Sequence, residues 1–514
     1  MRERLEGFIF VLAVGAAVAM GAKRVGMAYN VALVLIGLIL VFANVLPHAP
    51  LDPELVLVAL LPMLVFEGAL FADAESFKAA SRPILALSVP GVVISLVATA
   101  GVSTFVLGLP FAVALLLGAL LSITDTVSVL LAFRSARVPR RLAAIMEGES
   151  LFNDGTALVL VSVTTGVVAR GSFDAGGVTQ SLVLALVGGV GLGAAFGAVA
   201  GAALRRSPDH LTGVLLSMVV VFATSLIAER LHVSAVIAVV VMGLMVGRAA
   251  RSALDPSRVL ALQGFWEVVG FAVNVLLFLL VGMQIEAPML VSEASSILLA
   301  LLALHAGRAV AVYGCFAVLR AFKREIVPSR WQHVMVFGNI KGALSMAAVL
   351  ALPNDLPFRG RLVTIVFGVT FVTLVTQALP FGRVLRALGV AMVGANDAFD
   401  RARARLIAAR TAQNELDGLL ATGLLSRREH AERRAAFQRV VIESEGSLRT
   451  PEADAADDVL IDGAVLAAQK AALSNAALRG LIATDTAEAE TLEIDRRLLR
   501  LGNGDHGDST GGGA

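Results

Sequence analysis

Long apolar stretches of about 20 residues, separated by short polar connections, dominate this sequence. A stretch of that length can cross a lipid bilayer as a single helix. The chain has 514 residues, of which 57% are hydrophobic and 16% charged, and its mean hydropathy is +0.82. A soluble domain could not bury so much apolar side chain, so the sequence predicts an all-α, polytopic membrane protein. The thirteen candidate spans are 7–22, 28–46, 54–71, 83–107, 111–133, 145–169, 179–204, 210–229, 233–247, 260–284, 293–320, 331–352 and 362–388.

Basic residues near the ends of these spans predict the orientation of the chain. Lys and Arg collect in short connections on the cytoplasmic side of a membrane. If the first connection is cytoplasmic and the sides alternate, the cytoplasmic set holds nineteen Lys and Arg and the opposite set holds six. We therefore expect the N-terminus outside and the C-terminus in the cytoplasm.

The number of spans also predicts an internal symmetry. Six helices, one helix that crosses back, and six more helices form two halves of opposite orientation. Many secondary transporters are built in this way, with the binding site at mid-membrane where the two halves meet. The halves share no visible sequence similarity, so the prediction of two inverted six-helix repeats rests on the count alone.

The chain changes in composition after residue 390. The segment RARARLIAARTAQNELDGLLATGLLSRREHAERRAAFQRVV is charged and helix-periodic, a second such segment follows Pro451, and the last residues are rich in Gly and polar groups. We expect a membrane domain at 1–390, a cytoplasmic helical tail at 391–500 and a disordered C-terminus at 501–514. The single cysteine, Cys315, excludes an intramolecular disulfide, and its apolar surroundings favour a packing role.

Ionisable residues inside the spans are the candidates for function. A charged side chain at mid-bilayer costs at least about 2.5–3.5 kcal/mol, so such a group normally faces a partner or water. These residues are few: Glu67, Asp125, Glu147, Glu149, Asp154, Glu267, His305, Arg308 and Lys341.

Asp125 lies well inside its predicted helix, beside the hydroxyls of Ser122, Thr124 and Thr126. Such hydroxyls can bond to backbone carbonyls and loosen a helix. A local break would place free carbonyl oxygens beside a carboxylate, which together suit a small cation. The alternative is a capped kink that contains a buried acid.

The stretch EGESLFNDGTA (147–157) carries three carboxylates in a membrane span. Ser150 and Asp154 are four residues apart and therefore share a helix face. Glu149 points elsewhere, and Lys341 is the expected partner, because a buried lysine needs a counter-ion to keep its proton. We expect a structural Glu149–Lys341 ion pair, which leaves Asp154 to bind ions.

These motifs resemble one family. GESLFNDGTA, with ITDTVSVLLAF and VPRRLAAIMEGE before it, is similar to the cation/proton antiporters of the branch that contains bacterial sodium/proton antiporters and animal sodium/proton exchangers. The resemblance continues through LPMLVFEGAL, FWEVVGFAVNVLLFLLVGMQI, GRAVAVYG and GNIKGALSMAAVLALP, and so covers almost all of residues 1–390. It implies about 13 transmembrane helices in two inverted repeats whose crossing helices are broken.

The resemblance also implies roles for individual residues. Asp154 matches the carboxylate that binds the ion and the proton, and Asn153 matches an asparagine typical of electroneutral exchangers. Thr124, Asp125 and Ser150 match residues that help to form the cation site, so Na⁺ is expected at Asp154, Asp125, Thr124 and Ser150. The residue matching Lys341 is usually arginine in relatives. That difference matters because a buried lysine can lose its proton and an arginine cannot.

The expected function is therefore one-for-one, electroneutral exchange of Na⁺ or Li⁺ for H⁺ by competition at Asp154. The resemblance further implies a homodimer in the plasma membrane, with pH homeostasis as its role and no cofactor beyond the transported ions. We expect no nucleic-acid partner. A K⁺/H⁺ antiporter with the same mechanism is the nearest alternative. A cation channel would need rings of carbonyl or acidic groups, and a membrane enzyme would need a second catalytic group; the sequence offers neither.

Overall fold

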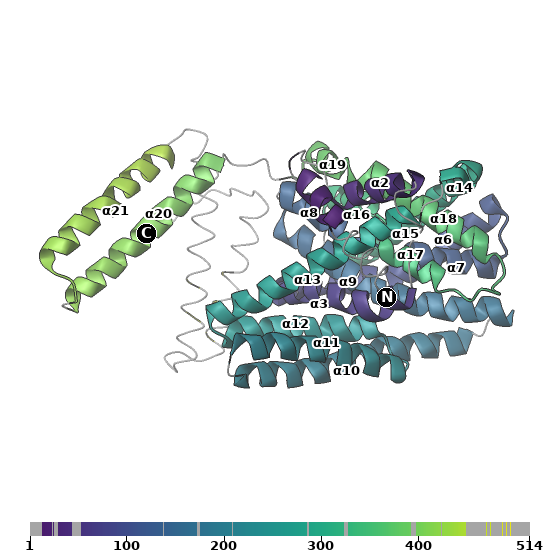
Figure 1. Ribbon diagram of the computed structural model, residues 1–514, viewed down its shortest axis with the longest axis horizontal. Coiled ribbons are helices and arrows are strands. Elements are labelled where there is room, and N and C mark those ends of the chain that lie inside the picture. The colour runs from purple at the N-terminus through teal and green to yellow at the C-terminus, as the bar shows by residue number, and fades with distance from the viewer. Residues whose placement is uncertain are drawn as a thin grey trace, which may run out of the picture. The chain divides into compact units, whose positions relative to one another are not determined.

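The computed structural model of this chain describes residues 13–22, 24, 29–43, 53–136, 138–171, 175–207, 209–284, 287–322, 327–391, 397–422, 424–448 and the single positions 469, 473, 486, 490 and 494. Helices account for nearly all of these residues, which confirms the all-α prediction. The chain divides into two compact units, Met1–Val393 and Gly394–Ala514 (Figure 1). The predicted disordered end at 501–514 and most of the predicted second tail segment lie outside the described residues.

The first unit is built from α-helices and three short π-helical segments, which are labelled η. Their bounds are α2 (Tyr29–Phe42), η1 (Leu55–Leu60), α3 (Leu61–Phe71), α4 (Ala74–Ala79), α5 (Ser81–Ala86), η2 (Leu87–Gly91), α6 (Val92–Leu107), α7 (Phe111–Ser122), α8 (Thr126–Ala136), α9 (Arg140–Arg170), α10 (Ala175–Arg206), α11 (His210–Arg230), α12 (Ala235–Ala253), α13 (Pro256–Met283), α14 (Ala287–Ser292), α15 (Ala294–Ala321), α16 (Ser329–Phe337), α17 (Ala343–Leu350), α18 (Arg359–Thr373), η3 (Leu374–Ala378) and α19 (Phe381–Ala387).

The helices agree with the predicted membrane spans. Within the described residues, nine helices are long and apolar enough to cross a membrane, and shorter apolar helices lie at Ala13–Ala22, Tyr29–Phe42 and Leu55–Phe71. Each of the thirteen predicted spans overlaps one helix, a run of consecutive helices or a pair of helices separated by a break. The polytopic fold is confirmed, while the number of crossings stays a prediction.

Two of the predicted spans are broken helices. The span at 111–133 consists of α7 and α8 with extended backbone between them, and the span at 331–352 consists of α16 and α17 separated by 338–342. The hydroxyls around Asp125 predicted the first break. The breaks occupy the fifth span of the first six and the fifth span of the last six, as inverted repeats require.

Contacts between helices divide the first unit into two bundles. The panel bundle contains α2, α3 and α10–α13, and the core bundle contains α6–α9 and α15–α18. In Figure 1, α10, α11 and α12 lie side by side along the lower edge of this unit. A Cβ atom at Gly193 would lie only 2.3 Å from the carbonyl oxygen of Ala238, so glycine allows α10 and α12 to pack backbone against backbone. The bundles meet where α9 contacts α10 and α12.

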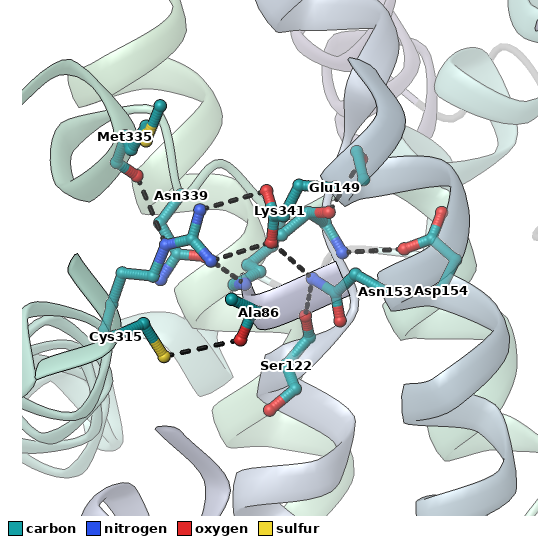
Figure 2. Close-up of polar contacts among 12 residues, drawn as sticks. Ala86, Ser122, Glu149, Asn153, Asp154, Cys315, Met335, Asn339 and Lys341 are labelled. Atoms are coloured by element: carbon teal, nitrogen blue, oxygen red, sulfur yellow. Dashed lines mark hydrogen bonds and ion pairs between the residues drawn. The ribbon is translucent and has the colours of Figure 1, made fainter. Parts of the chain in front are cut away.

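Cys315 has a more specific role than packing. Pro90, in η2, has no N–H to donate to the carbonyl of Ala86 one turn earlier. The thiol of Cys315 on α15 donates to that carbonyl at 3.3 Å (Figure 2). The cysteine therefore adds a side-chain donor to this carbonyl, beside the π-helical turn that the proline occupies.

The second unit contains a helical hairpin of α20 (Asp397–Ala421) and α21 (Arg427–Leu448). Arg410 pairs with Glu445 at 2.6 Å, and His430 contacts Asp417 at 2.7 Å, so the two helices run antiparallel. Most of their residues are exposed, and charged residues are frequent among them. The assignment of this unit to a cytoplasmic tail stays a prediction.

Candidate cation site

The site is built where the two broken helices cross. The backbone N–H of Asp125 donates to the carbonyl of Ile340 at 2.8 Å, and Ser345 Oγ lies 3.3 Å from the carbonyl oxygen of Ile123. A Cβ atom at Gly342 would lie 2.9 Å from Asp125 Cβ, so this crossing depends on glycine. The helix ends that meet here carry partial charges, with carbonyl oxygens at the end of α7 and amide groups at the start of α8.

Asp154 faces this crossing from α9. Its Oδ1 atom accepts a hydrogen bond from the backbone N–H of Thr124 at 3.1 Å. The hydroxyls of Thr124 and Ser150 lie 2.8 Å apart, and the side chains of Ser150 and Asp154 follow one another along α9 as the four-residue spacing predicted. Asp154 is only 8% exposed. Carboxylate and hydroxyl oxygens thus converge on the break, and such hard oxygen donors suit a small cation.

Asp125 contributes a second carboxylate and also has a structural role. The hydroxyl of Ser128 donates to its Oδ2 atom, and the side-chain amide of Asn30 donates in turn to Ser128. Asp125 directly precedes α8, where its negative charge favours the positive helix end. Both interpretations of Asp125, as part of a cation site and as the cap of a kink, are compatible with this position. The residue lies at the crossing and also precedes the first turn of α8.

A small cavity lies beside these groups. It has a volume of about 10 Å³ and is lined by Thr124, Asp125, Glu147 and Ser150 among others. That volume holds about one water-sized species. Among the residues that the structure describes, no cluster of three or more His, Cys, Asp or Glu forms a conventional metal centre. Binding of Na⁺ by Thr124, Asp125, Ser150 and Asp154 stays a prediction.

The expected ion pair between Glu149 and Lys341 is wrong. Arg308 on α15 donates to both carboxylate oxygens of Glu149, from Nη1 to Oε1 at 2.8 Å and from Nη2 to Oε2 at 3.1 Å. Its Nε atom donates to the carbonyl of Met335 near the end of α16, 3.2 Å away. The planar guanidinium matches a carboxylate with two parallel hydrogen bonds, which an ammonium group cannot do.

Lys341 lies in the break between α16 and α17 and is fully buried. Its Nζ atom donates to Asn339 Oδ1 at 2.7 Å (Figure 2). Its backbone N–H donates to the hydroxyl of Thr373 at 3.1 Å. The lysine is therefore held on a neutral amide within its own break, close to the carboxylates but hydrogen bonded to none of them.

Asn153 links the two helices that carry the carboxylates. Its side-chain N–H₂ donates to the carbonyl of Ser122 at 3.0 Å and to Glu149 Oε1 at 3.3 Å (Figure 2). Both partners are acceptors, so this position requires a donor, and an ionised aspartate there would face two acceptors.

Two contacts of this network were not predicted from the sequence: Arg308 as the partner of Glu149, and Asn339 as the acceptor for Lys341. Arg308 was a detectable candidate, because an arginine in mid-span must find an acid, and no acid lies one turn away on its own helix. Asn339 could not be identified in this way, because a neutral polar side chain carries no charge and so does not require a charged partner.

The sequence of this chain is similar to those of known sodium/proton antiporters. A sequence profile described as "Sodium/hydrogen exchanger, transmembrane" matches residues 9–387. The chain is 37% identical to the Na(+)/H(+) antiporter NhaS2 of Synechocystis over 97% of this chain and 94% of that protein. It is 35% identical to the Na(+)/H(+) antiporter ApNhaP of Aphanothece halophytica over 80% of each chain.

A solved structure shares the fold. The sodium proton antiporter MjNhaP1 from Methanocaldococcus jannaschii, determined at pH 8, superposes with a TM-score of 0.64 at 20% sequence identity. The match covers 75% of this chain and 98% of that chain. At this level of identity the likeness concerns the fold.

Proposed function

This chain belongs to the sodium/hydrogen exchanger family, and we propose that it exchanges Na⁺ for H⁺ one for one by competition at Asp154. Members of this family are ion antiporters, so the activity is transport and the ions are cargo. The observation that carries the proposal is the position of Asp154. Its carboxylate contacts the broken helix at Thr124, beside the hydroxyl pair of Thr124 and Ser150.

Competition follows from the chemistry of one carboxylate. Asp154 must lose its proton to coordinate a cation, so cation binding releases a proton and protonation releases the cation. The charged, empty site is costly to move through a low-dielectric region, whereas the protonated or cation-loaded site carries less net charge. Each passage between the two sides therefore moves either Na⁺ or H⁺, and the two flows are coupled.

One-for-one exchange requires that no second group change its proton during the cycle. Asn153 is neutral and acts as a donor, and Glu149 has both oxygens bound to Arg308. Asp125 and Lys341 are the other ionisable groups at the crossing, and the proposal requires that each keep one protonation state throughout. The positive-inside count supports an N-terminus outside and a cytoplasmic C-terminus. The family resemblance supports a homodimer in the plasma membrane that contributes to pH homeostasis.

Purified protein in liposomes that contain a pH-sensitive dye tests the proposal. An imposed Na⁺ or Li⁺ gradient should drive proton movement, and Asp154→Asn should abolish it because an amide cannot exchange a proton for a cation. The matched control is Asp355→Asn, the same substitution at an exposed position between α17 and α18, which should transport as the wild type does. Full Na⁺-driven flux in Asp154→Asn would contradict the mechanism, and a response to K⁺ alone would favour the potassium antiporter.

A further inference from the structure

Asn30 is a buried polar residue that contacts the cation site from the panel bundle. It lies in the first turn of α2, in the otherwise apolar helix YNVALVLIGLILVF, and is 0% exposed. Its side-chain amide donates to the hydroxyl of Ser128, 98 residues away in α8. Because α2 belongs to the panel bundle and α8 to the core bundle, this hydrogen bond joins the two bundles beside the site.

Close packing of α2 on α13 fixes the position of Asn30. A Cβ atom at Gly37 of α2 would overlap with the carbonyl oxygen of Leu279, and one at Gly282 of α13 would overlap with the carbonyl oxygen of Val34. Backbones this close require glycine on both helices. We therefore expect α2 and α13 to move together, which makes Asn30 a fixed point of the panel bundle.

Ser128 transmits the contact of Asn30 to Asp125. Its hydroxyl carries one proton, which it donates to Asp125 Oδ2, so its oxygen accepts the hydrogen bond from Asn30. A serine in a helix can instead donate to the carbonyl four residues earlier, here that of Thr124. The donor from Asn30 holds the Ser128 oxygen in place and polarises its hydroxyl, which strengthens the bond to Asp125.

Packing alone does not account for an asparagine at this position. Its Oδ1 atom is buried and has no hydrogen-bond partner among the described residues. A buried polar atom without a partner destabilises the folded protein, whereas a leucine of similar size would carry no such penalty. The choice of asparagine over an apolar residue therefore indicates a role in function and not in stability.

We propose that Asn30 is a positioning residue of the cation site, which acts through Ser128 to hold the Asp125 carboxylate in place. Because Asn30 lies on the panel bundle, a displacement of the core bundle would break its bond to Ser128 and loosen Asp125. The affinity of the site for its cation then depends on the arrangement of the two bundles. This inference rests on the proposed function, since it takes Asp125 to be a ligand of the transported cation.

Cation-dependent thermal unfolding of the purified protein in detergent tests this role. A ligand that binds the folded state raises the unfolding temperature, and the concentration dependence gives its dissociation constant. Na⁺ is titrated against choline at constant ionic strength. In Asn30→Leu the dissociation constant for Na⁺ should rise about two- to tenfold, the range for the loss of one hydrogen bond. The unfolding temperature without Na⁺ should equal or exceed that of the wild type.

Ser128→Ala tests the same contact from its other side. It should weaken Na⁺ binding at least as much as Asn30→Leu does, because it removes the hydroxyl that contacts Asp125. Adding Asn30→Leu to Ser128→Ala should have no further effect, since Asn30 acts through that hydroxyl. A further loss of affinity in the double variant would overturn the relay through Ser128.

Ser217→Ala is the matched control. Ser217, on α11, is also a buried serine that accepts a hydrogen bond from a side chain on another helix, that of Trp266 Nε1 at 2.9 Å, but it donates to a backbone carbonyl and not to an acid. Its loss should lower the unfolding temperature and leave the dissociation constant for Na⁺ unchanged.

The remaining outcomes decide between this inference and the proposed function. An unchanged dissociation constant in Asn30→Leu, or loss of the folded protein, would overturn the positioning role. A wild type that binds Na⁺ but exchanges no protons in liposomes would contradict the proposed function alone, because the binding comparison needs no transport. The same titration with K⁺ covers a potassium antiporter, and a wild type that neither cation stabilises would contradict both.

Discussion

At the residue scale, the strongest polar interaction of the site is the pair of Glu149 and Arg308. Both side chains are almost fully buried, and the guanidinium satisfies both carboxylate oxygens and a helix-end carbonyl together. A buried ion pair adds little net stability compared with apolar packing, but removal of one partner leaves a buried charge. The pair therefore fixes α9, α15 and α16 relative to one another.

We predict that Arg308→Met destabilises the protein by about 3–5 kcal/mol, because it leaves Glu149 buried without a cation. Lys341→Met should cost less, since it leaves only the neutral amide of Asn339 without its donor. Thermal unfolding in detergent compares the two variants. A double-mutant cycle should show strong coupling between Glu149→Gln and Arg308→Met; stronger coupling between Glu149→Gln and Lys341→Met would restore the pairing expected from sequence.

Sequence could identify the carboxylates but not every partner. Asp154 and Ser150 were placed on one face by their spacing, which depends only on helix geometry. The partner of Glu149 lies 159 residues away on another helix, so its identity depends on how α9 and α15 pack. Hydrogen-bond geometry decides whether Arg308 or Lys341 pairs with Glu149, and that geometry exists only in the folded chain.

At the scale of the elements, the crossing of the two broken helices positions the site. The first break was predictable, because hydroxyls flank Asp125 in an otherwise apolar helix. The second break was implied only by the family resemblance, and no residue pattern located it, although Gly338 and Gly342 lie at its two ends. Glycine in an apolar span more often serves close helix packing, as at Gly193, so its presence alone does not predict an interruption.

We predict that Gly342→Ala destabilises the crossing by about 1–3 kcal/mol and reduces exchange, because the added Cβ atom would lie 2.9 Å from Asp125 Cβ. Gly360→Ala is the matched control. Nothing lies within 4 Å of a Cβ atom there, and alanine favours the helix α18. Thermal unfolding and dye-monitored flux measure both effects, and wild-type behaviour in Gly342→Ala would contradict the role of this contact.

At the scale of the whole molecule, the apolar stretches predicted most of the architecture. A membrane limits the backbone to spanning helices, so hydropathy alone locates them. The inverted-repeat fold was then expected from the number of predicted spans and from the family resemblance. The division into panel and core bundles and the pairing of Glu149 with Arg308 depend on packing between helices far apart in sequence, and no single-sequence pattern encodes them.

The stability that Asp417 gives to the tail hairpin of α20 and α21 should not change with pH in the neutral range. Hydrogen bonds from His430 and Arg434 hold the pKa of Asp417 below its ordinary value of 3.8. A lowered pKa in the folded state contributes stability above the ordinary value and loses it as pH falls through the lowered one. We therefore predict that the contribution of Asp417 to hydrogen-exchange protection in α20 and α21 stays constant from neutral pH down to the ordinary pKa of 3.8.

Asp417→Asn provides the check on that prediction. At neutral pH it should increase hydrogen exchange in α20 and α21 of the full chain, because the carboxylate is lost. Glu432→Gln, which removes only the exposed pair with Arg428, should exchange like the wild type. Identical exchange in both variants and the wild type would show that the Asp417 contacts do not hold the hairpin together.

The central claim is that one carboxylate, Asp154, carries both ions, and the most direct test is the charge moved per cycle. Proteoliposomes should be given a Na⁺ gradient while a potassium–valinomycin clamp sets the membrane voltage, and the initial proton flux recorded with an internal dye. We predict the same flux at zero and at imposed voltage. Voltage-dependent flux would contradict one-for-one exchange, and its loss in Lys341→Met would identify Lys341 as the second proton carrier.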